Sequence, residues 1–186
     1  MSQFIVIDGI DGAGKSTVAE MLASTLGYQY LKSPGKEFSG VREYFENPDL
    51  MLARFYFYAA TTLYLSEVIR QELSAGNSVV CDRYIYSTIA YHRAMGLDIN
   101  NDTVKKLFAT LVKPTYYCAL AADFEVCKQR IQQRGVSSRA DQWLEKDIAL
   151  QQNVVEQFRL LNVPIIDTSV LEPIQVCNFI SNQAIK

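Results

Sequence analysis

The sequence has few cysteines and none of the spacings that cysteine-based sites require. Its four cysteines lie at positions 81, 118, 127 and 177, and no two of them form a CxxC pair. Such wide spacing is typical of isolated thiols in a reducing compartment. We therefore expect buried cysteines and a cytoplasmic protein, with neither a disulfide frame nor a zinc site.

The sequence also lacks an excess of one charge and a long apolar run. Its 18 basic and 20 acidic residues give a net charge of −2, whereas modules that bind duplex nucleic acid usually carry a basic excess. The longest uncharged stretch near the middle, residues 55–66, is too short to span a membrane. The N-terminus shows no cationic stretch followed by an apolar signal region. We expect neither a nucleic-acid polymer nor a membrane as a partner.

Short apolar runs alternate with helical patterns along the whole chain. Continuous apolar runs are typical of strands buried on both faces of a parallel sheet, and strand–helix alternation is typical of α/β folds. The expected strands cover residues 4–7, 28–31, 78–81, 115–120 and 164–166. The expected helices cover residues 15–26, 48–74, 86–95, 102–111, 124–133, 142–161 and 172–184. At 186 residues we expect one domain, residues 1–186.

A glycine-rich segment, residues 9–16 (Gly-Ile-Asp-Gly-Ala-Gly-Lys-Ser), fits the phosphate-binding pattern GxxxxGK[ST] at every position. It lies between an expected strand and an expected helix, which a chance glycine-rich turn would not require. Backbone N–H groups of such a loop point at phosphate oxygens, and the helix N-terminus adds partial positive charge. Lys15 would reach the terminal phosphates, and Ser16 would hold Mg²⁺. The predicted nucleotide-binding residues of this loop are Gly9, Asp11, Gly12, Ala13, Gly14, Lys15, Ser16 and Thr17.

A second polar pair follows the expected strand at residues 78–81. Asp82 is a candidate Mg²⁺ carboxylate or, alternatively, a helix cap, since Asp commonly precedes a helix. Arg83 comes directly after it, and a cap does not explain this arginine. No NKxD guanine-reading motif is present, and motor or transport ATPases are normally larger. The sequence therefore predicts a P-loop nucleotide binder of another kind.

Phosphoryl transfer between two anions needs positive charge where they meet. Two unit charges about 4 Å apart repel by about 4 kcal/mol at an effective dielectric constant near 20. The expected sheet-end loops offer Lys15, Arg83 and a cluster of three arginines at positions 130, 134 and 139. Each arginine alone also fits a solvated surface position. Their shared place beside strand ends, where α/β proteins bind ligands, favours a phosphate role.

Several segments together resemble the thymidylate kinase family over nearly the whole chain. They are residues 4–17, residues 81–84 with Ser87, Thr88, Ala90 and Tyr91, the arginine-rich residues 130–139, and residues 166–169. The resemblance implies a three-layer P-loop NTPase fold, with a five-stranded parallel sheet flanked by helices and a short arginine-bearing lid at about 134–140. It also implies an ATP-dependent phosphotransferase, often a homodimer, that uses Mg²⁺ and converts dTMP to dTDP.

On the acceptor side, the resemblance assigns roles residue by residue. Arg83 would hold the acceptor phosphate, and Asp11 would lie near the acceptor sugar and phosphate or the metal. Tyr91 would pack on the deoxyribose and Phe57 would stack on the base, although both aromatics also fit core packing. The predicted substrate-binding residues are Asp11, Lys32, Pro34, Phe57, Thr61, Arg83, Ser87, Thr88 and Tyr91.

On the donor side, the resemblance implies that the lid supplies cations to ATP. Arg130 and Arg134 would bind the nucleotide, with Arg134 near the adenine, and Arg139 would reach the transferring phosphates. His92, the single histidine, is expected to be a polar lining or surface residue, because an anionic acceptor needs no general base. The predicted catalytic residues are Asp11, Lys15, Arg83 and Arg139, and the predicted metal ligands are Ser16 and Asp82.

Two positions depart from the family pattern and leave the acceptor base open. The family usually has an arginine four residues after the stacking Phe, where this sequence has Thr61, so thymine reading should be weaker, water-mediated or done by another group. Residues 32–36 replace the family's REPGG stretch and lose its Glu and one Gly, although Lys32 would still serve the acceptor phosphate.

Two alternatives to the dTMP kinase follow. A related kinase would act on another nucleoside monophosphate or on a nucleoside, and a free hydroxyl would need Asp11 or Asp82 as a general base. A nucleotide-binding regulatory module without turnover would need only the first few of the polar residues above. The retention of Asp82, Arg83 and the lid arginines argues against such a module.

Overall fold

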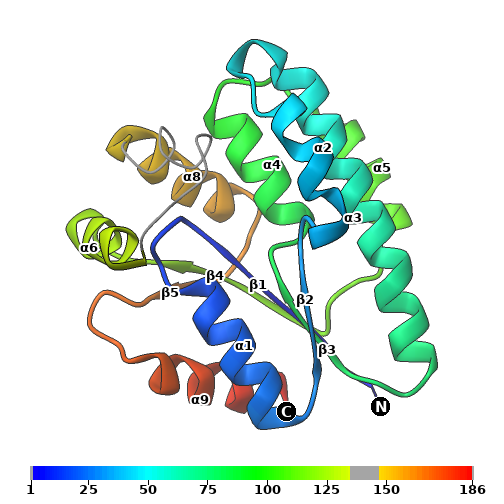
Figure 1. Ribbon diagram of the computed structural model, residues 1–186, viewed down its shortest axis with the longest axis vertical. Helices are drawn as coiled ribbons and strands as arrows, with labels where there is room; N and C mark the ends of the chain where they lie inside the picture. Colours follow the sequence, from blue (N-terminus) through cyan, green and yellow to red (C-terminus); the bar gives the residue numbers. More distant parts are fainter. Residues whose placement is uncertain (1, 135–146, 186) are drawn as a thin grey trace.

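The expected strands form one sheet in which all neighbours are parallel, in the order β2-β3-β1-β4-β5 (Figure 1). The structure is a computed structural model that describes residues 2–134 and 147–185. Its strands are β1 (Phe4–Gly9), β2 (Gln29–Lys32), β3 (Val79–Asp82), β4 (Tyr116–Ala121) and β5 (Ile165–Asp167). The predicted α/β fold with a five-stranded parallel sheet is confirmed.

The register of the sheet determines which loops meet at its carboxyl edge. β1 lies at the centre, and all six of its residues are buried, as expected for a continuous apolar run covered on both faces. Ile7 of β1 pairs with Asp82 of β3, and Gly9 pairs with Leu120 of β4. The glycine-rich loop and the chain after Asp82 therefore leave the sheet side by side.

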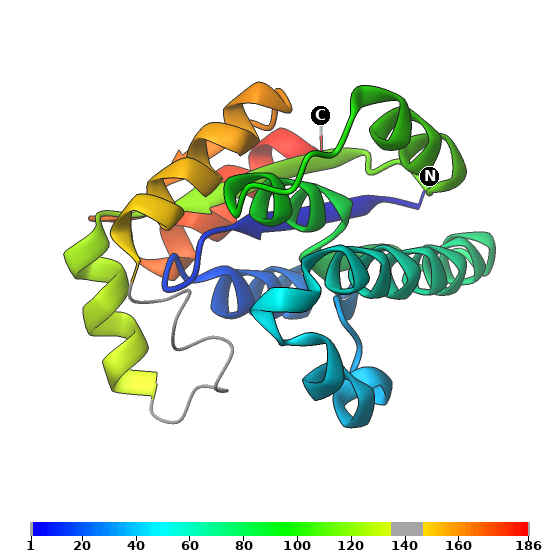
Figure 2. The same cartoon turned by 90° about the horizontal axis from the view of Figure 1, so that it is seen from above.

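Helices cover both faces of the sheet. They are α1 (Lys15–Leu26), α2 (Ser39–Phe45), α3 (Met51–Ser74), α4 (Ile85–Ala94), α5 (Asn101–Thr110), α6 (Phe124–Arg134), α8 (Ile148–Leu160) and α9 (Pro173–Ala184). α1 packs against α9, whereas α4 packs against α8 and α3 (Figure 1). Figure 2 shows α1 and α8 on opposite sides of the strands. The result is the three-layer arrangement expected from the strand–helix alternation.

The structure differs from the expected elements mainly between β2 and α3. A 3₁₀ turn (Lys36–Phe38) and α2 occupy a stretch in which no helix was expected. α3 begins at Met51 rather than at position 48, because a separate 3₁₀ turn (Pro48–Leu50) precedes it, capped by the side chain of Asn47. The expected lid at 134–140 and the start of the helix expected at 142–161 lie outside the described residues, apart from the backbone of Arg134, the last residue of α6.

The four cysteines are buried, free thiols, as expected. Within residues 2–134 and 147–185, no helix combines the length and the apolar character that crossing a membrane requires.

Candidate functional site

The glycine-rich loop adopts a backbone that depends on its glycines. Gly9, Gly12 and Gly14 all have positive φ, at 134°, 81° and 89°, a region that other residues rarely adopt. A Cβ atom on Gly12 would lie 2.6 Å from the carbonyl oxygen of Cys127 in α6. The loop can therefore follow this path, close to α6 and leading into the N-terminus of α1, only with glycine at these positions.

Lys15, the first residue of α1, is held inside this loop. Its Nζ donates to the carbonyl oxygen of Ile10 at 2.5 Å and lies 3.5 Å from Asp11 Oδ1. Burial and the nearby Arg83 guanidinium lower the pKa of Lys15 to about 8, although Asp11 acts in the opposite direction. The ammonium is thus short of compensating negative charge, which a phosphate would supply.

Ser16 and Asp82 lie together, as the metal-site prediction requires. The Ser16 hydroxyl donates to Asp82 Oδ2 at 2.5 Å, and the Lys32 ammonium lies 3.0 Å from Ser16 Oγ and 3.2 Å from the same carboxylate oxygen. Burial alone would raise the pKa of Asp82, but Lys32 and then Lys15 lower it. Asp82 Oδ1 is buried and has no hydrogen-bond partner within the described residues. The hydroxyl and the carboxylate are hard oxygen ligands of the kind that Mg²⁺ takes, and the Lys32 ammonium is the cation beside them in this structure.

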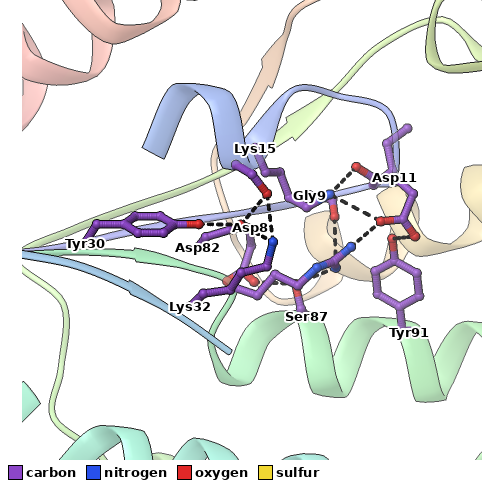
Figure 3. A network of polar contacts seen from close by, with 12 residues as sticks. Asp8, Gly9, Asp11, Lys15, Tyr30, Lys32, Asp82, Ser87 and Tyr91 are labelled. Atoms are coloured by element: carbon purple, nitrogen blue, oxygen red, sulfur yellow. Dashed lines mark hydrogen bonds and ion pairs between the residues drawn. The ribbon is translucent and has the colours of Figure 1, made fainter. Parts of the chain in front are cut away.

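Arg83 and Asp11 form the second cluster of the site. Arg83 Nη2 contacts Asp11 Oδ1, and the guanidinium lies 5.1 Å from the centre of the Tyr91 ring. The Tyr91 hydroxyl donates to the other oxygen of Asp11 at 3.2 Å (Figure 3). Burial alone would raise the pKa of Asp11, but Arg83 and Lys15 lower it to about 2. Asp11 is therefore an anion that orients Arg83 and not a proton acceptor near neutral pH.

Asp8, at the end of β1, is a residue that the sequence analysis did not single out. It is fully buried, its Oδ1 accepts from the Tyr84 backbone N–H at 3.1 Å, and it contacts the Ser87 hydroxyl. The Arg83 guanidinium reaches Ser87 Oγ at 3.4 Å. Asp8 thus ties the start of α4 to β1 and fixes the turn that carries Arg83, whose φ of 70° is unusual for a residue other than glycine.

Two cavities open on either side of Lys15, Ser16 and Lys32, and these three residues line both. The first, called the acceptor cavity below, also contains Asp11, Arg83 and the side of α4 that carries Ser87, Thr88, Tyr91 and His92. The second, called the donor cavity, has a volume of about 710 Å³ and includes Gly12, Ala13, Gly14, Thr17 and Arg130. Arg130 donates to the carbonyl oxygen of Thr168 at 2.9 Å, which holds it at the cavity wall.

Most of the predicted acceptor residues reach the acceptor cavity, but two do not. The cavity includes Lys32, Pro34, Arg83, Ser87, Thr88 and Tyr91. Phe57 and Thr61 are not among its described lining residues. Phe57 stacks on Phe45 with ring centres 4.6 Å apart, and the Thr61 hydroxyl bonds back to the carbonyl oxygen of Tyr58 in its own helix. Among the predicted donor residues, the Arg134 side chain and Arg139 lie outside the part of the chain that the structure describes.

Four helical residues of the acceptor cavity were not predicted as substrate-binding residues. Arg42, Arg54 and Tyr58 line it from α2 and α3, and His92, expected as polar lining or surface, is only 2% exposed. The spacing of Arg54 and Tyr58, and of Thr88 and His92, places each pair on one helix face. That spacing was the available signal, but it does not say which face of α3 meets the cavity.

The sequence model of the family described as thymidylate kinase matches residues 7–172. This chain belongs to the thymidylate kinase family. Curated members include a probable thymidylate kinase of Methanocaldococcus jannaschii, 31% identical over 90% of this chain and 88% of its own, and the thymidylate kinase of Exiguobacterium sibiricum, 31% identical over 98% and 88%.

Solved structures agree with the thymidylate kinase fold. Thymidylate kinase from Candida albicans superposes with a TM-score of 0.76 at 22% identity, over 100% of this chain and 94% of the other. Deoxyadenosine kinase from M. mycoides with bound dATP superposes with a TM-score of 0.70 at 18% identity, over 99% and 100%. At these identities the likeness concerns the fold, and it confirms the P-loop NTPase architecture.

Proposed function

We propose that this protein transfers the γ-phosphoryl group of ATP to dTMP, giving dTDP and ADP. The observation that carries this proposal is the pair of cavities that share Lys15, Ser16 and Lys32. Two phosphate-bearing molecules, one in each cavity, would meet at these cations. Such convergence offsets the repulsion between donor and acceptor phosphates, which is the main barrier that an enzyme of this type must lower.

Different residues of the chain bind the two substrates. The glycine-rich loop, Lys15 and Arg130 bind the phosphates and nucleoside of ATP, while Arg83, oriented by Asp11, binds the acceptor phosphate. Ser16 and Asp82 would hold Mg²⁺, which when bound neutralises charge on the donor phosphates. In this proposal Arg134 and Arg139 complete the donor side, and residues 1–186 act as one kinase domain.

A nucleoside acceptor fits the site less well than a nucleotide. A free hydroxyl must lose a proton and needs a carboxylate able to take it. The pKa of Asp11 is lowered to about 2, and Asp82 accepts from Ser16 and pairs with Lys32. Neither carboxylate suits this role, whereas Arg83 suits an acceptor that is already an anion.

The exposed surface of α3 supports a dimer as part of the proposed function. α3 exposes Leu52, Tyr56 and Leu63, with 57%, 60% and 40% of their surface accessible, and their spacing of four and seven residues places them in one stripe along the helix. A second copy of the chain would cover this stripe in a two-fold dimer.

The proposed location is the cytoplasm, because four buried free thiols fit a reducing compartment.

A coupled ADP-release assay tests the activity. We expect ADP release with ATP, Mg²⁺ and dTMP, and none with thymidine, because thymidine gives Arg83 no anion to bind. Lys15→Ala serves as the control and should abolish release while the chain stays folded by circular dichroism. Release with thymidine alone would show that the enzyme is a nucleoside kinase instead.

A further inference from the structure

The acceptor cavity is lined by a buried polar pair with no role so far. It consists of Arg54 of α3 and His92 of α4, which are 5% and 2% exposed and both line the cavity. α4 runs from Ser87, beside Arg83, to His92, a rise of roughly 7 Å. An acceptor whose phosphate lies at Arg83 would therefore extend along α4 and bring its base to Arg54 and His92.

His92 presents a hydrogen-bond acceptor to the cavity. Its Nδ1 lies 2.7 Å from the carbonyl oxygen of Thr88, and because a carbonyl can only accept, Nδ1 carries the proton. Nε2 then has a lone pair, and it is buried without a hydrogen-bond partner within the described residues. Burial lowers the pKa of His92 to about 4, so the ring stays neutral at neutral pH. A ligand N–H group would satisfy this buried acceptor, which is costly to leave unpaired.

Arg54 presents donors beside it. Its Nη2 lies 3.2 Å from Glu46 Oε2, and its guanidinium lies 5.7 Å from the centre of the Tyr58 ring. Glu46 is itself fixed, since it accepts from Arg42 Nε at 2.6 Å and from the Tyr58 hydroxyl at 2.7 Å. A guanidinium has five N–H donors in a rigid fork. Arg54 Nη1 donates to Met95 Sδ at 3.6 Å, and a thioether sulfur is a weak acceptor. Arg54 can therefore keep Glu46 and give this donor to a ligand carbonyl.

We propose that Arg54 and His92 read the imide edge of the acceptor base, with a base carbonyl accepting from Arg54 and the neighbouring ring N–H donating to His92 Nε2. This inference rests on the proposed kinase function and names the groups that replace the arginine absent at Thr61. Thymine shows the required N–H next to a carbonyl. Cytosine carries a lone pair at the same ring nitrogen, which would face the lone pair of His92. A site that leaves buried polar groups unpaired rejects the wrong base strongly.

Steady-state kinetics with His92→Phe test the pair. Phe keeps an aromatic ring against Phe55, whose ring centre lies 5.5 Å from that of His92, but removes the acceptor. We expect the KM for dTMP to rise about tenfold or more, the preference for dTMP over dCMP to fall by a similar factor, and the KM for ATP to stay within about twofold. His92→Gln supplies an amide oxygen at the same place and should restore most of the preference.

Arginine variants on one helix provide the matched comparison. Arg54→Lys keeps the charge but loses the fork, and should raise the KM for dTMP without changing the KM for ATP. Arg70→Lys lies on the same helix, in an exposed pair with Glu67 outside the cavity, and should match the unaltered enzyme. If Arg54→Lys and Arg70→Lys behave alike, Arg54 does not read the base.

A spectroscopic readout separates binding from turnover. Because His92 is the single histidine, its imidazole nitrogens need no assignment in an untagged, ¹⁵N-labelled chain. The Nε2 resonance should move upfield on addition of dTMP, as expected when a lone pair accepts a hydrogen bond, and stay in place with ATP alone. If dTMP is phosphorylated but neither this resonance nor the dTMP/dCMP preference of His92→Phe changes, the pair does not read the base and the kinase function stands. If no nucleotide supports ADP release, the function and this inference fall together.

Discussion

Arg83 shows how one residue depends on several neighbours. Its backbone φ is 70°, its side chain pairs with Asp11, and its ring neighbour Tyr91 is held by the same carboxylate. A strained backbone at a ligand site is tolerated when the surrounding contacts over-determine it. Here Asp8 provides this support, through the Tyr84 N–H and the Ser87 hydroxyl.

Replacing Arg83 should therefore affect the acceptor and spare the donor. Arg83→Gln removes the cation that faces the acceptor phosphate, and a lost hydrogen bond to a charged group costs about 1.5–3 kcal/mol. We expect the KM for dTMP to rise about 10- to 100-fold and the KM for ATP to change little. Initial-rate measurements with each substrate varied in turn check this. An increase confined to the KM for ATP would place Arg83 at the donor instead, and equal increases would show that it does not act on the acceptor specifically.

His92 should leave a signature in the pH dependence of stability. Its pKa falls from 6.5 to about 4 on folding, so below pH 6.5 the unfolded chain takes up a proton that the folded chain excludes. The free energy of unfolding should decrease as the pH falls from about 6.5 to about 4, by about 2 kcal/mol between pH 7 and pH 5. Urea unfolding of the unaltered protein and of His92→Gln at both pH values measures this, since the other groups cancel in the comparison. Parallel changes in the two proteins would contradict it.

At the scale of elements, the continuous apolar runs predicted β1, β3, β4 and β5, because strands inside a parallel sheet favour such runs. β2 has no such run, since its four residues are exposed or half-buried. α2 could not be found in this way, since it buries none of its seven residues. The sequence also did not predict which side of α3 faces the acceptor cavity. Phe57 and Tyr58 are adjacent aromatics, and only the packing of Phe57 on Phe45 shows that Tyr58 faces the cavity. The glycine-rich loop and the turn after β3, by contrast, follow from local spacing alone.

The contact between the glycine-rich loop and α6 gives a prediction at this scale. In Gly12→Ala the new Cβ would meet the Cys127 backbone at 2.6 Å, with φ at 81°, whereas Gly76→Ala has a similar φ of 89° and open space. The left-handed backbone alone costs about 1–2 kcal/mol. We expect Gly76→Ala to lose about that much unfolding free energy and Gly12→Ala clearly more, together with weaker ATP binding. Thermal melts with and without ATP compare them, and equal losses would show that the loop does not press on α6.

At the scale of the whole molecule, the exposed apolar stripe on α3 has a direct test. Tyr56→Glu places a charge in the middle of the stripe, where a partner copy would bury it without a counter-charge. We expect the unaltered chain to sediment as a dimer and Tyr56→Glu as a monomer at micromolar concentration. Glu72→Gln lies on the same helix, nine residues after Leu63 and therefore on the opposite face, and should remain dimeric. If the unaltered chain sediments as a monomer, the stripe is not a dimer interface.

The shared wall between the two cavities has one more consequence. Because Lys15, Ser16 and Lys32 belong to both cavities, the two cavities adjoin at these three residues. One molecule carrying adenosine and thymidine at opposite ends of a single oligophosphate bridge can fill both cavities at once. The second end then binds at the high local concentration that the first end creates, so such a molecule should inhibit in competition with ATP and with dTMP alike.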